Sequence, residues 1–531
     1  MRNVVARTID DVKPQILSEV EGVLDSCMQA AHAGASAAEL EPSLVRGLAL
    51  PVRRMIALVL ACACRGAFLR DIEARGLTPA QVKLRTDKSG YATVHTAAGP
   101  VTFPIFAYLD SSTPLPVTRS PAREILPYHR DCRSSPLSLQ WEARLAAHFP
   151  FRKAEELFKF FTNGAATIED TTISHHVLVI GSMVEPSWLY QTPEEIRRIL
   201  NERATRDKKT NRPLLYLSSD AHALRRYVGE TWATEWKMTN GIRVWCEDAA
   251  TGKIIHLGGE FLWGDCREVG RRIQALLDDG VLPNGDEAWQ AVNPQIVFVS
   301  DGTEWLTEHV IPLLGDVVVI LDPYHLIDWF AAFARVVLGI GTDETKELHA
   351  KLNLVLFGKQ PRRTGTAPRV RRGHKKKRGA RREHAHDRKN LRRGRPRTVT
   401  SDVTTKGLID LLYSIKLHTP EQEQAREALV ERLANNALRT DYAVHLARGM
   451  QIGSGPMESM HRSGSQQRLK LAGAKWREES SLAILRFRML ELSGRWEEFW
   501  ARVDLVPWLA KAFREAPKRH RAPAGVEICP T

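Results

Sequence analysis

Three acidic residues that lie far apart in the chain occupy positions where carboxylates could act together. Asp220 and Asp301 each directly follow a strongly apolar, strand-like run, and Glu458 follows the glycine-rich stretch Gly453-Ser-Gly-Pro456. Ligands of open sheets gather beyond the strand ends, where neighbouring strands diverge. A single aspartate in such a place is equally well explained as a helix cap or a solvated carboxylate, but the combination with a loop-to-helix glutamate favours one shared site.

Two aspartates brought side by side would repel each other unless a cation lay between them. Mg²⁺ is the expected ion because it is hard and prefers carboxylate and phosphate oxygens, and Mn²⁺ is an alternative. Two such ions about 3.5–4 Å apart can activate an attacking oxygen and stabilise the leaving oxygen of a phosphodiester. Asp220, Asp301 and Glu458 are therefore predicted to be both the catalytic residues and the metal ligands, with water or a DNA 3′-hydroxyl as the nucleophile.

The elements that must position these carboxylates alternate between strands and helices in the middle of the chain. The expected order is βββαβαβα, which is typical of an α/β fold with a mixed sheet and helices on its faces. In this order the first and fourth strands lie side by side, so Asp220 and Asp301, which are expected to end these strands, can approach each other. The expected strands are 213–219, 242–247, 253–263, 295–300 and 316–321, and the expected helices are 266–277, 303–313 and 325–338.

The N-terminal part of the chain shows helical and β patterns that carry no evident chemistry. Apolar spacing predicts helices between residues 8 and 75, with Pro42 and Pro51 at turns or helix starts. A β-hairpin is expected between residues 91 and 108, with Gly99-Pro100 as its turn.

A second helical region follows, from Pro136 to Val184. It predicts a helix that ends at Asn163-Gly164 and a further helix that Thr167 caps. Helix, tight turn and helix fit a DNA-reading helix-turn-helix, but an ordinary helical hairpin has the same pattern, and both remain open. His175-His176 within it are expected to be surface or packing residues rather than metal ligands.

The positive charge of the chain is concentrated in one segment. The chain has a formal charge of +14, and residues 361–400 contain 17 Lys or Arg against only Glu383 and Asp387. Such a block suits a polyanion, because each neutralised phosphate releases condensed counterions. The alternative is a solvated, disordered tether without a specific partner. The candidate DNA-binding residues here are Lys375, Lys376, Lys377 and Arg378.

The motifs around the three carboxylates resemble a known family. Gly453-Ser-Gly-Pro-Met-Glu458-Ser459, together with Leu-Tyr-Leu-Ser-Ser-Asp220 and Ile-Val-Phe-Val-Ser-Asp301-Gly302, resembles the DDE transposases of bacterial insertion sequences, and the nearest group looks like the ISKra-four family. Residues 467–476 and 495–500 are similar to that family's C-terminal signature, and the resemblance spans roughly residues 90–500.

The resemblance implies an RNase H-like core on which Asp220, Asp301 and Glu458 are the catalytic triad. The spacings are 81 and 157 residues, and the long second spacing implies a helical insertion before the glutamate. It further implies an active enzyme that binds two Mg²⁺ ions, cleaves the ends of its own element and transfers them into target DNA. Because two ends must be held together, a homodimer or larger assembly on DNA is expected.

Asp322-Pro-Tyr-His325 resembles the C/D-x-x-H motif that follows the second aspartate in this family. Asp322 ends a buried strand beside the site, and His325 is a candidate to contact a phosphate or to order a metal-bound water. A packing role at the start of a helix explains His325 equally well. The sequence departs from many relatives after Asp220, where Ala221-His222 replaces a glycine, and His222 is expected to be exposed.

Four basic residues lie on or just after the helix of Glu458. A helix that brings a carboxylate to metal ions also brings its neighbours to the DNA backbone, and such contacts position DNA without reading its sequence. A solvated helix face is the alternative. The four candidates are Arg462, Arg468, Lys470 and Lys475.

These observations predict an N-terminal helical and β region with DNA-binding function, a catalytic core with a helical insertion, and a tail. The expected divisions are 1–85 helical, 86–135 small β region, 136–200 helical with the possible helix-turn-helix, 210–338 first part of the core, 339–450 helical insertion with the basic segment 361–400, 451–500 last part of the core, and 501–531 tail.

Composition limits the classes of protein that remain. Seven scattered cysteines without a Cys-x-x-Cys pair do not suggest a disulfide framework or a zinc site. The longest strongly apolar run, Met55–Cys64, is shorter than the roughly 20 residues of a membrane helix, and the N-terminus lacks an apolar signal core. A soluble intracellular protein is therefore expected, and the resemblance to transposases of bacterial insertion sequences implies a bacterial, cytoplasmic and nucleoid-associated one. Two other functions remain open: an RNase H-like DNA nuclease or resolvase that cuts without joining, and a DNA-binding regulator with a silent site.

Overall fold

The computed structural model describes residues 9–87, 90–110, 117–126, 132–229, 231–357 and 405–502. The chain divides into two compact units. Unit 1 is formed by residues 1–185 and 477–531, and unit 2 by residues 186–476. The segment 451–500, expected as the last part of the core, is therefore divided between the units. The basic segment 361–400 lies outside the described residues, as do its four candidate DNA-binding residues.

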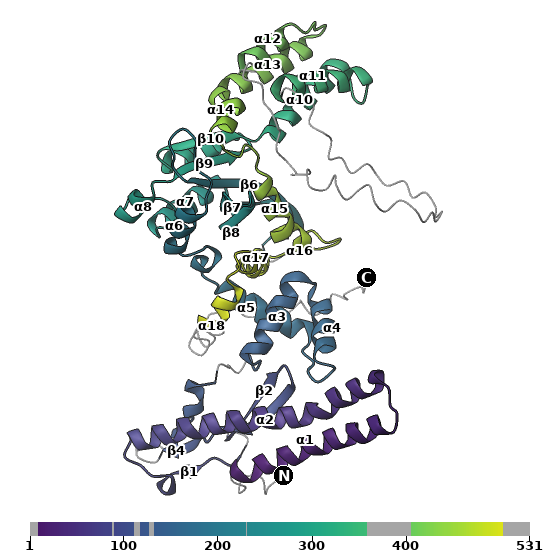
Figure 1. Cartoon of the computed structure of the whole chain (residues 1–531), viewed down its shortest axis with the longest axis vertical. Coiled ribbons are helices and arrows are strands. Elements are labelled where there is room, and N and C mark those ends of the chain that lie inside the picture. The colour runs from purple at the N-terminus through teal and green to yellow at the C-terminus, as the bar shows by residue number, and fades with distance from the viewer. Residues whose placement is uncertain are drawn as a thin grey trace. The chain divides into compact units, whose positions relative to one another are not determined.

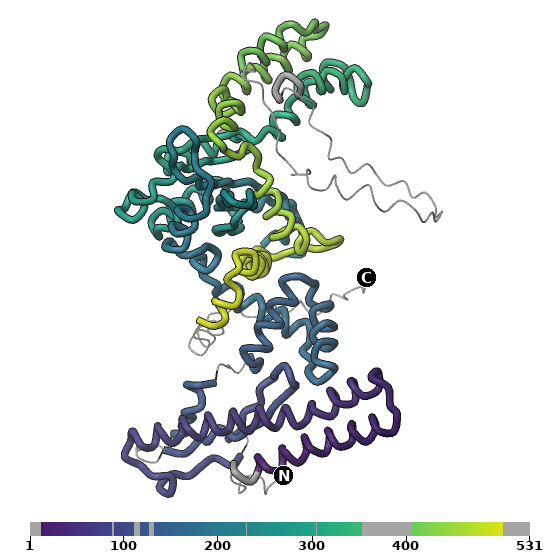
Figure 2. The backbone as a smooth tube through the Cα atoms, in the orientation of Figure 1, coloured from purple at the N-terminus to yellow at the C-terminus, as the bar shows by residue number. Residues whose placement is uncertain are grey.

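Unit 1 combines two long helices, short strands and a group of shorter helices. Figure 2 shows the first two helices running side by side in opposite directions. The elements are α1 (Ile9–His32), α2 (Ala37–Ala74), β1 (Lys83–Leu84), β2 (Tyr91–Thr96), β3 (Gly99–Pro104), β4 (Tyr108–Asp110), β5 (Val117–Arg119), α3 (Pro136–His148), α4 (Phe151–Phe161), α5 (Asp170–Ser182), α17 (Glu478–Leu492) and α18 (Trp496–Arg502).

Three local predictions for unit 1 were wrong. Pro42 and Pro51 lie inside α2 and do not mark its ends. Gly99-Pro100 belongs to β3, where Gly99 pairs with Thr96, so the hairpin turn precedes it. Thr167 does not cap α5. This helix begins at Asp170, whose amide donates a 3.1 Å hydrogen bond to Oε2 of Glu155 in α4.

The returning chain completes the helical part of unit 1. α17 packs against α3 and α5, although more than 290 residues separate them in sequence. The contact with α5 is close, because a Cβ added at Gly181 would lie 2.7 Å from the carbonyl oxygen of Ala483. A buried ion pair stabilises the same group, since Glu142 of α3 lies 2.8 Å from the ring of His176 in α5. His176 is thus a packing residue, as one of the two expectations had it.

One described helix, α2, is long and apolar enough to cross a membrane by length and composition alone. An apolar stretch of 18 residues within α2 is longer than the run Met55–Cys64, on which the expectation from sequence rested. A single helix of this kind is a weak sign, because helices of ordinary folded proteins pass the same test. The described cysteines are all free thiols.

Unit 2 is built on a five-stranded mixed sheet with the strand order β10-β9-β6-β7-β8 (Figure 1). The elements are α6 (Pro193–Glu202), β6 (Leu214–Tyr227), β7 (Thr234–Glu247), β8 (Ile254–Trp263), α7 (Cys266–Asp278), α8 (Glu287–Val292), β9 (Gln295–Ser300), α9 (Glu304–His309), β10 (Val317–Leu321), α10 (Pro323–Leu338), α11 (Asp343–Phe357), α12 (Thr405–Tyr413), α13 (Pro420–Asn435), α14 (Tyr442–Ala447), α15 (Gly455–Met460) and α16 (Gln467–Leu469).

The expected order of strands and helices is observed, with the short α8 as an unpredicted addition. β6 and β9, the first and fourth strands of the sheet, are parallel neighbours, as predicted. β9 and β10 are also parallel, whereas β6, β7 and β8 are antiparallel to each other. The sheet is therefore mixed, and the carboxyl ends of its three parallel strands meet at one edge.

The prediction that the first strand ends at Asp220 was wrong. β6 continues to Tyr227 and pairs with β7 throughout, whereas its pairing with β9 stops at Leu217. Beyond that point β6 keeps only β7 as a neighbour, and beyond His222 the two strands form a two-stranded ribbon, because the pairing of β7 with β8 begins at Thr239. Its free edge receives the chain again near Trp476, whose backbone exchanges two hydrogen bonds with residues 225 and 227.

Helices α10 to α14 form a group beyond the β10 edge of the sheet (Figure 1). Their apolar side chains share one core with the sheet, in which Phe330, Leu412 and Leu433 are fully buried together with Leu214 and Tyr216 of β6. Alternate residues of a strand point to the same face, so this is the sheet face that also carries Asp220.

The helix expected from Met457 to Leu469 is interrupted. α15 ends at Met460, a π-helical turn spans residues 461–466, and α16 completes the segment. Single π-turns inside helices are uncommon and often occur beside functional sites.

Candidate active site

Asp220 lies at the point where β6 loses its partner on one side. Its backbone pairs with Gly241 of β7, and β9 has already diverged. The side chain is partly buried, and its Oδ1 accepts a 2.7 Å hydrogen bond from the amide of Ala221. The carboxylate therefore stands where two parallel strands separate, as the strand order predicted.

Asp301 directly follows β9, the parallel neighbour of β6. Its Oδ1 accepts hydrogen bonds from the amide and the hydroxyl of Thr303, at 3.1 and 2.9 Å. These bonds hold the turn that leads into α9 and fix the side chain near the strand end.

Glu458 reaches the same region from a distant part of the sequence. It lies in α15, which contacts β6 and β7. Its amide donates a 3.1 Å hydrogen bond to the carbonyl of Ser454, and its side chain is exposed. The segment before α15 is tied to the sheet, because the amide of Gln451 donates to the Tyr216 hydroxyl at 2.9 Å and the indole of Trp245 donates to Oε1 of Gln451 at 3.1 Å.

The charges of these residues act on each other. Burial raises the pKa of Asp220, and the negative charges of Asp301 and Asp322 raise it further. The side chain of Glu458 reaches solvent but is partly covered by the protein, and this partial loss of water raises its pKa; the charges of Asp322 and Asp220 add to the shift. His325 opposes both shifts, since its positive form favours the ionised carboxylates. These residues therefore form one electrostatically coupled group, which we call the carboxylate cluster. It consists of four carboxylates and one imidazole: Asp220, Asp301, Asp322, Glu458 and His325.

The arrangement is open rather than preassembled. Within the described ranges, no three His, Cys, Asp or Glu side chains are arranged as a ready-made metal site. The donor set nevertheless suits a hard divalent cation, because its oxygens are carboxylates that disfavour each other's ionisation. No Lys or Arg in the described residues forms an ion pair with Asp220, Asp301 or Glu458. The metal-binding and catalytic roles of these residues stay predictions.

Asp322 differs from the other carboxylates because protein donors occupy both of its oxygens. It is fully buried at the N-terminus of α10, and its Oδ1 accepts a 2.7 Å bond from the amide of Tyr324. Its Oδ2 accepts a 2.6 Å bond from the Ser454 amide and a second bond from the Ser454 hydroxyl. His325 is partly buried one turn further on.

A packed pair of histidines lies behind Asp220. The rings of His222 and His461 are 4.5 Å apart, and Nε2 of His222 lies 2.7 Å from the hydroxyl of Ser465. Burial lowers the pKa of His222 to about 3 and that of His461 to about 4. The expectation that His222 is exposed was wrong, because the extension of β6 places this residue under the π-turn of residues 461–466.

Gly241 allows the helix of Glu458 to approach the sheet. A Cβ at this position would lie 2.3 Å from Met457 Cε, 2.9 Å from His461 Nε2 and 3.1 Å from Met460 Cε. Close beside it, Arg243 donates a hydrogen bond to the carbonyl of Pro456, and burial lowers its pKa to about 10. The surface of β7 is thus shaped to receive α15.

The four basic candidates near Glu458 differ in exposure. Arg462, Lys470 and Lys475 are exposed, so they remain candidates for phosphate contacts. Arg468 is buried, and its guanidinium lies 4.9 Å from the ring centre of Trp476. A side chain packed in this way is not available to a phosphate, so the structure does not support the prediction of a DNA contact for Arg468.

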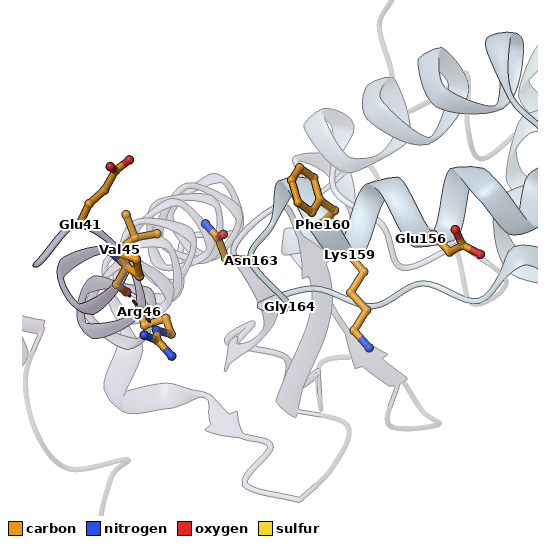
Figure 3. A pocket seen from close by; sticks show the side chains of 9 residues that line it. Glu41, Val45, Arg46, Glu156, Lys159, Phe160, Asn163 and Gly164 are labelled. Carbon is orange, nitrogen blue, oxygen red and sulfur yellow. Dashed lines mark hydrogen bonds between the residues drawn. The ribbon is translucent and has the colours of Figure 1, made fainter. Parts of the chain in front are cut away.

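A hollow of about 560 Å³ lies in unit 1, between α2 and the end of α4 (Figure 3). Figure 3 shows Glu41, Val45 and Arg46 on one side and Lys159 and Phe160 on the other. Its lining mixes both charges with exposed apolar groups, and it contains none of the carboxylate cluster, which belongs to unit 2.

Sequence reasoning missed Gly241, Ser454 and the histidine pair. A glycine inside an apolar strand often marks a close approach of another segment, but Gly241 preceded the expected strand 242–247, and only the structure shows that β7 begins earlier and includes it. The partner of Ser454 was not detectable, because Asp322 lies 132 residues away.

Comparisons with known proteins found no matching family model and no matching curated protein. Among solved structures, the chain is similar to the Drosophila P element transposase strand transfer complex. The identity is 12%, the match covers 71% of this chain and 83% of that chain, and the TM-score is 0.22. At this TM-score the likeness supports no conclusion about fold or function.

Proposed function

We propose that this protein is a metal-dependent DNA transposase with an RNase H-like core, in which Asp220, Asp301 and Glu458 hold two Mg²⁺ ions. The observation that carries the proposal is the convergence of three distant segments, since Asp220 stands where β6 and β9 separate, Asp301 follows β9, and the helix of Glu458 contacts β6 and β7. Burial raises the pKa of Asp220 and of Glu458, and the charge of Asp301 adds to the shift of Asp220 while that of Asp220 adds to the shift of Glu458. The strand order, with the first and fourth strands parallel and adjacent, supports the same proposal.

The chemistry follows from what each residue can do. Bound at the three carboxylates, the ions would activate the attacking oxygen and stabilise the leaving oxygen of a phosphodiester. Asp301 is oriented by Thr303, and Glu458 approaches from the helix that packs against β7. His325 lies where its positive form favours the ionised carboxylates, which suits a role in contacting a phosphate.

DNA binding rests on charge. Arg462, Lys470 and Lys475 are exposed on the segment that follows Glu458. Residues 361–400 add a strongly basic stretch. Such groups bind the DNA backbone without reading its sequence, so recognition of element ends needs a further part of the chain. The helices α4 and α5 are the proposed reader, and a homodimer would hold two ends.

The decisive experiment uses the full-length protein and a plasmid that carries the coding region with its natural flanking DNA. With Mg²⁺, the wild type is expected to cut at the flanks and to join the ends to a second plasmid. Asp301→Asn and Glu458→Gln are expected to lose at least about a hundredfold of both activities while DNA binding is retained. The matched controls Asp328→Asn and Glu431→Gln alter exposed acids of the same unit and are expected to retain activity.

The outcomes separate the three candidate functions. Cutting without joining of pre-cut ends supports a nuclease or resolvase. Binding without any cutting by the wild type supports a silent DNA-binding regulator. Full activity in Asp301→Asn would overturn the assignment of the site itself.

A further inference from the structure

We infer that Asp322 is a positioning residue that holds the Glu458 helix against the sheet through Ser454, and that it is not itself a ligand for a metal ion. The inference rests on the proposed function in one respect: it takes metal binding as the reason why Glu458 must be held in place. The contacts themselves are independent of any reaction.

The helix that carries Glu458 is short. α15 has six residues, and with the π-turn and α16 the helical segment reaches only from Gly455 to Leu469. Isolated helices of this length are at best marginally stable in water, because nucleation is costly and few hydrogen bonds repay it. The position of Glu458 must therefore be set by contacts with the rest of unit 2 rather than by the helix alone.

The N-terminus of α15 is linked to Asp322 through Ser454. Oδ2 of Asp322 accepts hydrogen bonds from both the amide and the hydroxyl of Ser454. Ser454 in turn offers its carbonyl to the amide of Glu458, at 3.1 Å. Only one residue thus stands between the carboxylate of Asp322 and the backbone of Glu458.

Asp322 is itself held by hydrogen bonds to neighbouring segments of unit 2. Its amide donates a 2.7 Å hydrogen bond to the carbonyl of Ser300, the residue before Asp301. Its Oδ1 is engaged by the amide of Tyr324, and the preceding carbonyl of Leu321 accepts a 2.9 Å bond from the Tyr442 hydroxyl. The ends of β9 and β10 and the start of α10 are joined at this point.

The carboxylate of Asp322 is fully buried, so its charge needs partners within the protein. A buried charge is tolerated when hydrogen-bond donors surround it. Asp322 receives three donors from Ser454 and Tyr324, so its oxygens are already satisfied. A metal ion would have to displace these bonds, whereas Asp220 and Glu458 lack such a set of donors in the described residues.

The test measures local order and activity separately, on the full-length protein. Ser454→Ala removes the hydroxyl donor, Ser454→Thr retains it, and Asp322→Asn removes the charge. The controls Ser459→Ala and Asp328→Asn alter exposed residues of α15 and α10. Hydrogen exchange is followed without DNA or metal, and plasmid cleavage is then measured with Mg²⁺.

In Ser454→Ala, exchange protection at residues 457–460 is expected to fall about five- to tenfold, while β9 is unchanged. Cleavage is expected to fall about 10–100-fold with DNA binding retained, and Ser454→Thr is expected to restore both. The double variant of Asp322→Asn and Ser454→Ala is expected to be no worse than Asp322→Asn alone, because both changes break one contact.

The failure of this inference and that of the proposed function are distinguishable. Lost protection in a protein whose wild type cuts no DNA would support the positioning contact and reject the transposase proposal. Unchanged protection at residues 457–460 in Ser454→Ala would overturn the positioning role. Multiplicative effects in the double variant would also overturn it, because the two residues would then act through different contacts.

Discussion

Replacing Gly241 by alanine is expected to displace the helix of Glu458 with little other change in the sheet. Gly241 pairs with Asp220, and an added Cβ would lie 2.3 Å from Met457 Cε and 2.9 Å from His461 Nε2. A separation of 3.1 Å from Met460 Cε adds a third close contact. All three neighbours belong to the segment that carries Glu458, so the strain falls on that segment.

The size of the effect follows from two opposing terms. Overpacking a filled core costs about 1–3 kcal/mol, and Met457 and Met460 are buried, so their methyl groups have little space to yield. Alanine in a strand otherwise gains about 0.5–1 kcal/mol over glycine. The net loss is therefore at most about 2.5 kcal/mol, which corresponds to a fall in the unfolding midpoint of up to about 10 °C.

The expected loss of activity is larger than the loss of stability. A displacement of about 1 Å at reacting groups can cost about a hundredfold in rate. Cleavage of the flanked plasmid by Gly241→Ala should therefore fall by at least about tenfold at a temperature where the protein is fully folded. The comparison is Gly407→Ala, a helical glycine in α12 with no atom within 4 Å of an added Cβ. That variant should be as active as the wild type and slightly more stable.

The reasoning would be refuted if Gly241→Ala cut DNA at the wild-type rate. It would also be refuted if the loss of activity matched the small loss of folded protein, because the helix of Glu458 would then not be displaced.

Three further predictions concern charge. Asp220→Asn removes a carboxylate whose pKa is raised by burial and by Asp301, so the metal-free protein should melt about 1–3 °C higher at neutral pH. This gain should vanish at acid pH, where the wild-type carboxyl is also neutral, and the stabilisation of the wild type by Mn²⁺ should be absent from the variant. Arg448→Met leaves the fully buried Asp207 without its cation and should cost about 3–5 kcal/mol in urea unfolding at pH 7. Because the pKa of Asp207 is held well below its usual range by hydrogen bonds that include Arg448, this difference should shrink as the pH falls below about 4. Replacing residues 375–378 by alanine should reduce the salt dependence of duplex binding by up to about 3.6 in the log–log slope, and an unchanged slope in fluorescence anisotropy would exclude a phosphate role.

The sequence predicted the sheet well because its parallel strands come from short, mostly apolar runs. β9 is buried along its whole length, as is typical of a central parallel strand, and β10 at the edge of the sheet is a wholly apolar run that is partly buried. Their order along the chain left few possible arrangements, so the adjacency of β6 and β9 could be predicted from the order alone.

The sequence failed where structure depends on partners far along the chain. β6 was expected to end at Asp220 because apolar residues stop there. The strand continues because β7 pairs with it and because the segment near Trp476 bonds to its free edge. The interruption of the Glu458 helix has a similar origin, since His461, the first residue of the π-turn, packs against His222 of β6.

The sequence predicted which residues belong to the candidate site, but not which of them hold the fold and which are left with fewer donors. Asp301 and Asp322 follow strands and Glu458 lies near the start of a helix, whereas Asp220 lies inside β6 beyond its pairing with β9. Sequence alone placed Asp322 with His325 as neighbours of the site. The structure separates the carboxylates by how their charge is compensated. Asp322 is compensated by donors of the protein, so its charge is used in holding the fold.

The charges of Asp220 and Glu458, in contrast to that of Asp322, lack a comparable set of donors among the described residues. Their ionised forms are disfavoured by burial and by each other, and no described Lys or Arg pairs with them. A protein gains no stability from such an arrangement while it is free of ligand. The arrangement becomes favourable only when an external cation supplies the missing charge, and binding it should release protons and strengthen as the pH rises. Under the proposed function, stability and metal binding make opposite demands on these carboxylates, and such a conflict is expected of a binding site but not of a structural network of acids.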